Sequence, residues 1–153
     1  MTPALAVLLL AGPPAGLGSI FDAAALAGLP SGREPWSLLR TAEATVTADR
    51  IESGGLFLGA PALFAVHGGS WTDTTWQLGD VDVTDPDRGG RPMISVPAEA
   101  LAALSLDTAL APAATGGAGA HVSMAPRRAG DAWKTALSLA TTPSGLNGSG
   151  EGT

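Results

Sequence analysis

Glycine and proline recur along the whole chain and limit what it can fold into. There are 21 glycines and 12 prolines among 153 residues. Glycine loses more conformational freedom than other residues when a helix fixes it, and proline lacks the N–H that a helix interior needs. The composition therefore argues against long helices and coiled coils and favours short strands joined by turns. Hydrophobic residues form 45% of the chain, which is enough for one core in one domain.

Alternation of apolar and polar residues predicts several short strands. In residues 41–49, Ala42, Ala44 and Val46 alternate with threonine and acidic residues, as in a half-buried strand. In residues 131–142 the same alternation puts Trp133 on one side together with two leucines. We expect this side, including Trp133, to face inward. The other predicted strands are residues 56–58, 63–66, 71–78, 81–83, 93–96 and 121–124, with turns at 53–55, 68–69 and 85–90.

Helix signals occur at two places. A capping-box pattern in residues 19–22 predicts a helix that starts there and continues over residues 23–27. Further along, a proline suited to the first helical position precedes Leu101 and Leu104, whose spacing fits one helical stripe. This pattern predicts a second helix over residues 97–106.

These elements predict a mainly β fold. About seven or eight short strands with two short peripheral helices are typical of a β-sandwich or a small barrel. Residues 36–39 fit either a helical turn or the start of a strand. The chain divides into an apolar N-terminal arm (1–18), a single β-rich domain (19–142) and a C-terminal tail (143–153). The tail has little to bury, so we expect it to be flexible unless a neighbouring molecule holds it.

The apolar run in residues 4–11 has three interpretations. An uncleaved arm or buried strand is favoured over a weak signal peptide and over a membrane anchor. The first basic residue is Arg33, so a signal peptide would lack its positively charged start. A Gly-Pro-Pro sequence at residues 12–14 also ends the run well before the roughly 20 apolar residues of a membrane-spanning helix. We predict no membrane span.

Charge and cysteine content exclude several classes of function. The formal net charge is −6, with 8 basic and 14 acidic residues, which argues against binding to a phosphate backbone and so against a nucleic-acid partner. The chain has no cysteine, which excludes disulfides, thiolate metal sites and cysteine nucleophiles. No cofactor motif is found, and we predict no cofactor.

Four carboxylates within eight residues form a weak candidate metal site. Ca²⁺ takes six to eight oxygen ligands, which such a cluster can supply in part. The spacing is not that of an EF-hand, because the sixth position is aspartate and the twelfth is Arg91. We expect a solvated turn beside the neighbouring arginines and no bound metal. The four residues are Asp80, Asp82, Asp85 and Asp87.

The two histidines do not carry a recognisable catalytic motif. His67 precedes Gly68 and Gly69, a sequence similar to the oxyanion-hole segment of lipase-type α/β-hydrolases, but the chain has no Gly-x-Ser-x-Gly elbow for the nucleophile. We therefore interpret this segment as a hairpin turn. His67 and His121 can share a metal or act as base and acid only if the fold brings them together. We predict no catalytic residues, and a small metal-dependent enzyme remains a second alternative.

Four tryptophans supply the candidates for contact with a partner. Trp71 and Trp76 are an odd number of residues apart, so a straight strand would expose one of them. The arms and the small β-rich body predict a structural subunit of a multi-subunit assembly, foremost a bacteriophage-type virion protein of the head, connector or tail. Its partners would be protein subunits of the same assembly, including copies of itself, in a virion or a cytoplasmic assembly. The alternative is a secreted or envelope-associated binding module that uses an exposed tryptophan.

Overall fold

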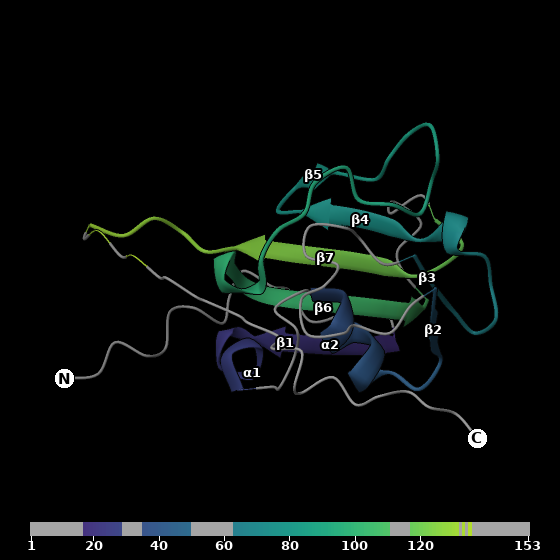
Figure 1. The fold of residues 1–153 in the computed structure, drawn as a ribbon, viewed down its shortest axis with the longest axis horizontal. Helices are drawn as coiled ribbons and strands as arrows, with labels where there is room; N and C mark the ends of the chain where they lie inside the picture. The colour runs from purple at the N-terminus through teal and green to yellow at the C-terminus, as the bar shows by residue number, and fades with distance from the viewer. Residues whose placement is uncertain are drawn as a thin grey trace, which may run out of the picture.

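Two open sheets form the body of the protein. A computed structural model describes residues 17–28, 35–49, 63–110, 117–131, 133 and 135. The larger sheet has five strands in the order β1 (Leu17–Asp22), β6 (Leu101–Ala109), β7 (His121–Pro126), β4 (Thr75–Leu78) and β5 (Val81–Asp82) (Figure 1). The smaller sheet pairs β2 (Val46–Ala48) with β3 (Phe64–Val66). The helices are α1 (Ala23–Gly28), α2 (Pro35–Ala42) and two 3₁₀ turns, η1 (Trp71–Asp73) and η2 (Ala98–Ala100).

The prediction of a mainly β fold is confirmed. Within the described residues there are seven strands and two short α-helices. The larger sheet ends in β1 on one side and β5 on the other, so among these residues it is open and does not close into a barrel. β7 lies at its centre, antiparallel to β6 and parallel to β4. None of the helices in the described ranges is long and apolar enough to cross a membrane.

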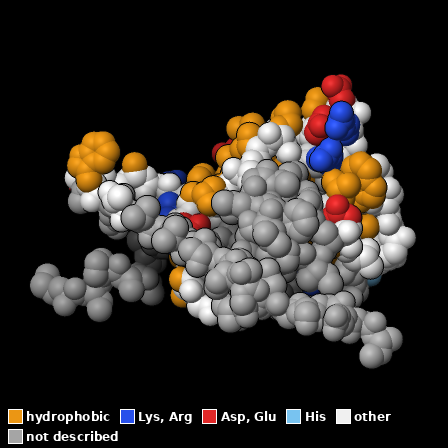
Figure 2. Space-filling view, in the orientation of Figure 1, with side chains coloured by type: hydrophobic (Ala, Val, Ile, Leu, Met, Phe, Trp, Pro, Cys, Tyr) orange, Lys and Arg blue, Asp and Glu red, His pale blue; other side chains and the backbone are white. Residues whose placement is uncertain are grey.

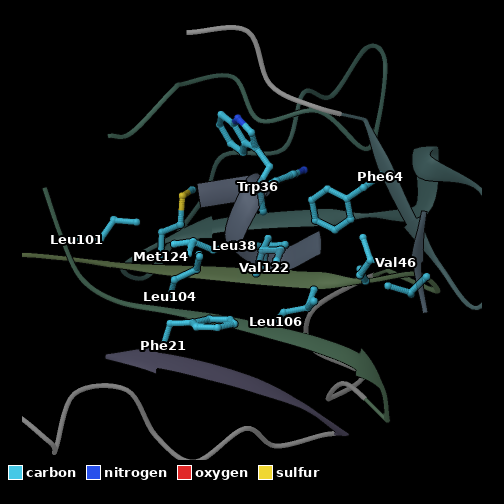
Figure 3. Packing of buried hydrophobic residues seen from close by; sticks show 14 of the residues in the cluster. Phe21, Trp36, Leu38, Val46, Phe64, Leu101, Leu104, Leu106, Val122 and Met124 are labelled. Atoms are coloured by element: carbon cyan, nitrogen blue, oxygen red, sulfur yellow. The ribbon is translucent and has the colours of Figure 1, made fainter. Parts of the chain in front are cut away.

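The core lies between the larger sheet and α2. Figure 1 shows α2 in front of the sheet, and its Trp36, Leu38 and Leu39 are buried. Alternate residues of the central strands face this helix, as Figure 3 shows for Leu104 of β6 and Val122 of β7. Each strand therefore gives one side to the core and the other side to the opposite face of the sheet.

Trp76 of β4 lies at the centre of an aromatic cluster. Its ring meets the ring of Trp36 edge-on, with 5.6 Å between centroids, and the ring of Phe64 with 5.2 Å. Its indole Nε1 donates a hydrogen bond of 3.0 Å to the carbonyl oxygen of Gly90. Because α2, β3 and the loop after β5 all contact this one side chain, Trp76 joins the two sheets and the helix.

The helix predicted over residues 97–106 is wrong. Only the η2 turn is helical, and the rest forms β6, the longest strand in the described residues. The pairing of β6 with β7 shifts between Leu101 and Ala103, which marks a bulge. The extra residue puts Leu101 on the same side as Leu104 although they are three apart, so a strand takes on helical spacing at this point. The following Leu104 and Leu106 have the ordinary spacing of two.

The start of the first helix is also corrected. Ser19 does not cap it but lies within β1, where its hydroxyl donates a 2.6 Å hydrogen bond to Oε1 of Glu43. The cap is Asp22, whose Oδ1 accepts a 2.8 Å hydrogen bond from the backbone N–H of Ala25. The helix itself, α1, matches the predicted residues 23–27 closely.

Three predicted strands differ from the structure. Residues 41–49 are divided, because α2 extends to Ala42 and only Val46–Ala48 is a strand. Residues 71–78 are divided in the same way: the Ser70 hydroxyl accepts a hydrogen bond from the N–H of Thr72 and caps η1, so the strand begins only at Thr75. Residues 93–96 form no strand.

Trp133 lies fully exposed in the structure, which overturns the prediction that its side of residues 131–142 faces the core. Its exposed fraction is 102%, and Asp131 and Thr135 on the same predicted face are exposed too. Neither Trp133 nor these two neighbours lies in a strand. The rest of that predicted strand lies outside the described residues, as do residues 50–62, the first sixteen residues of the predicted N-terminal arm (1–18) and the predicted tail (143–153). Leu17 and Gly18, the last two residues of the predicted arm, are the first residues of β1.

Candidate functional site

The acidic segment after β4 forms turns rather than a ligand cage. Oδ1 of Asp82 accepts a 2.8 Å hydrogen bond from the N–H of Thr84, and this bond holds the pKa of Asp82 below its ordinary value. Oδ1 of Asp85 accepts hydrogen bonds from the N–H groups of Asp87 and Arg88, at 2.9 and 3.3 Å. Carboxylates that bond to the backbone two or three residues on stabilise turns. Figure 2 shows acidic and basic side chains side by side near the top of the molecule.

No group of three or more histidine, aspartate or glutamate side chains in the described ranges is placed to hold a metal ion. Asp80 and Asp87 are both exposed, and Asp82 and Asp85 already bond to backbone N–H groups. Adding about 1 mM Ca²⁺ should therefore leave the melting temperature of the chain unchanged. A ligand at 100 times its dissociation constant would add about 2.7 kcal/mol of stability. A rise of several degrees that the Asp82→Asn variant abolishes would contradict this expectation.

The tryptophans are sorted differently from the prediction. Trp76 has an exposed fraction of 1% and is a core residue, so it is withdrawn as a candidate partner contact. Trp71 is half-buried in η1 and remains a candidate. Trp133 is fully exposed, and it takes the place of Trp76 as the aromatic side chain open to a partner.

The two histidines have different surroundings. His67 is exposed in the turn after β3, at a φ of 53°, and Gly68 follows at 73°. The N–H of Gly69 bonds to the carbonyl oxygen of Val66 and closes a turn. This turn is not the predicted hairpin, because β3 pairs with β2 and the chain continues into η1. His121, by contrast, is buried in β7 with an exposed fraction of 8%.

A row of polar residues crosses the face of the sheet opposite α2. Register pairs Gly18 of β1 with Asp107 of β6, Asp107 with His121 of β7, and His121 with Thr75 of β4. Residues paired across neighbouring strands lie on the same face, so the side chains of Asp107, His121 and Thr75 are adjacent. Nδ1 of His121 is 2.9 Å from the hydroxyl of Thr75, and which atom donates depends on the histidine tautomer. We call Asp107, His121 and Thr75 the polar row.

Burial shifts the acid–base behaviour of the polar row. Asp107 has an exposed fraction of 6%, and burial raises its pKa despite the opposing influence of His121. One of its oxygens, Oδ1, is buried without a hydrogen-bond partner. Burial likewise lowers the pKa of His121, and the negative charges of Asp107 and Asp82 offset only part of that shift. In both residues burial disfavours the charged form.

Only one hydrogen bond, between His121 and Thr75, links side chains of the polar row. The order of hydroxyl, imidazole and carboxylate matches the parts of a nucleophilic triad. However, His121 and Asp107 are both more than nine-tenths buried in the folded chain. Asp107 was not among the residues singled out from the sequence. The signal was its place in the alternation Leu104-Ser105-Leu106-Asp107, which is visible only when this segment is treated as a strand.

Comparison with known proteins gives a likeness of fold. No family model matches the chain, and no curated protein matches it. A solved structure of the outer membrane transporter YddB from Escherichia coli is similar, with a TM-score of 0.62 and 18% sequence identity. The likeness covers 76% of this chain but only 17% of the transporter chain. The mixed sheet is therefore an arrangement that also exists as a small portion of a much larger membrane protein.

Proposed function

We propose that the chain is a non-catalytic protein-binding domain of the cell envelope that works with an outer membrane transporter. One observation carries the proposal: three quarters of this chain shares its fold with a portion of such a transporter. Among the classes considered from the sequence, this favours the envelope-associated binding module. The buried polar row agrees with a domain that acts through contacts rather than catalysis, since its histidine and carboxylate are shielded from substrate.

Trp133 is the side chain that we expect to make such a contact. Tryptophan is enriched at the centres of protein interfaces because it buries a large apolar area and can also donate a hydrogen bond. Trp133 is fully exposed, so it can contact a partner without any rearrangement of the core. Trp71, which is half-buried, offers less free surface.

Membrane fractionation with chemical cross-linking tests the proposal. In the organism that encodes the chain, antibodies should find it in the outer membrane fraction, and cross-linking followed by mass spectrometry should identify a transport protein beside it. Trp133→Ala should lower the cross-linked yield severalfold without changing the unfolding midpoint. Recovery of the chain only as a free cytoplasmic protein would overturn the proposal.

The virion subunit remains a separate prediction. It shares with the proposal above the idea that the chain acts through protein contacts, but no feature of the described residues points to a virus particle. The same fractionation distinguishes the two. A chain that sediments with particles of defined symmetry, and is absent from the outer membrane, would support the virion subunit and exclude the transporter partner.

A further inference from the structure

Asp107 and His121 lie in an unusual place for two ionisable groups. They face each other across the inner strands β6 and β7, at the end of the sheet where β7 begins, with exposed fractions of 6% and 8%. Burying a charged carboxylate away from water costs free energy unless hydrogen bonds replace those to water. Oδ1 of Asp107 is buried and has no hydrogen-bond partner. The fold therefore contains a buried pair that is not locked into a fully bonded ion pair.

We propose that the polar row is an acid-sensitive contact at one end of the central strands, where protonation of His121 weakens the folded state as the pH falls from about 7.5 to about 5.5. The inference does not depend on the proposed function, because it concerns the fold of the chain alone. It rests on the register that joins β6, β7 and β4 at this row and on the burial of its two titratable members.

The surroundings of His121 determine the direction of the effect. Asp107 faces it from β6, and Asp82 on β5 acts on it through its charge. The other two residues paired across the sheet at this level carry no charge. They are Thr75 on β4 and Gly18 on β1. Two carboxylates would favour a protonated imidazole, but burial opposes it more strongly, so the pKa of His121 lies below its ordinary value.

Linkage turns this shift into a stability change. An unfolded chain takes up the histidine proton at the ordinary pKa of about 6.5, whereas the folded chain takes it up only at lower pH. Between these two pH values the unfolded chain binds more protons than the folded chain, so the stability is full above about pH 6.5 and is lost as the pH falls toward the pKa of the folded state. The raised pKa of Asp107 acts in the opposite sense and restores some stability at more acidic pH.

The hydrogen bond to Thr75 gives the proton a structural consequence. Neutral His121 can accept the hydroxyl hydrogen of Thr75 at Nδ1, over 2.9 Å. When His121 is protonated, both of its ring nitrogens donate. The Thr75 hydroxyl must then accept the bond from Nδ1, and its own hydrogen must point to another acceptor. The other acceptor near it, the carbonyl oxygen of Ala120, is 3.5 Å away. Protonation thus reverses the donor and the acceptor of the bond between His121 and Thr75, and it leaves the hydroxyl hydrogen of Thr75 only the longer bond to Ala120.

Urea unfolding of the full chain at about pH 7.5 and about pH 5.5 tests the proposal, because histidines titrate in this window and ordinary carboxylates titrate below it. The wild-type midpoint should be lower at the acidic pH. His121→Gln should remove most of that loss, and His67→Gln, the matched variant at the exposed histidine, should keep it. Asp107→Asn should enlarge the loss, because it removes a charge that favours protonated His121.

Two results would overturn the proposal. One is a wild-type midpoint that stays constant or rises on acidification, which would mean that protonation of His121 does not weaken the folded state. The other is an acid-induced loss of equal size in His121→Gln and wild type. If His121→Gln does not fold, an NMR titration of the wild-type histidine rings decides: His121 should titrate below about 6.5, and a value at or above it contradicts the proposal.

Discussion

Replacing Trp76 with alanine should lower the free energy of unfolding by about 3–5 kcal/mol, the usual range for truncating a large aromatic residue in a core. The side chain has an exposed fraction of 1% and contacts the rings of Trp36 and Phe64. Its loss would leave a cavity between the sheets and the helix and would remove the hydrogen bond to Gly90. Urea unfolding monitored by circular dichroism measures the effect.

Trp133→Ala is the matched control for this experiment. It removes the same side chain from a fully exposed position, so the free energy of unfolding should change by less than about 0.5 kcal/mol. Equal losses in the two variants would show that Trp133 is packed in the folded chain and is not exposed to solvent.

Gly90→Ala should lower the free energy of unfolding by about 2–5 kcal/mol, the sum of a backbone cost and a steric cost. Gly90 has a φ of 62°, in the left-handed region that L-residues with a Cβ adopt at a cost. A Cβ at this position would also overlap the carbonyl oxygen of Trp71. The loop after β5 would have to move away from η1 and would pull the acceptor carbonyl away from Trp76.

Gly79→Ala separates the two costs. Its φ is 59°, almost the same as that of Gly90, but an added Cβ would meet nothing within 4 Å. This variant should therefore lose only the backbone term, about 1–2 kcal/mol. If thermal or urea unfolding gave the same loss for both glycines, the close approach of the loop to η1 would be wrong.

Local patterns in the sequence were reliable where a single element determines them. The apolar run at residues 63–66 forms β3, buried on both sides, and the strand predicted at residues 121–124 forms the first part of β7. The turn signals of residues 85–90 correspond to a loop that bonds to itself from Asp85 to Gly89. In each of these segments, the propensity of the residues and the surrounding fold favour the same structure.

The predictions failed where tertiary contacts decide the structure. The bulge in β6 places Leu101 and Leu104 on one side at helical spacing, and only pairing with β7 reveals a strand. The polar row was missed for a related reason. Asp107, His121 and Thr75 are far apart in the sequence and become neighbours through strand pairing, which local periodicity does not encode. Register had to be known before these residues could be seen as one site.

The central position of β7 has a consequence for the order of folding. β1 can pair with β6, and β4 with β5, without β7, and these pairs form two separate halves. β7 follows all four strands in the chain and joins the halves by hydrogen-bonding to β6 on one side and β4 on the other. Until β7 is in place, both halves have an unpaired strand edge, which other chains can join. Synthesis therefore passes through a stage at which misassembly competes with completion of the sheet.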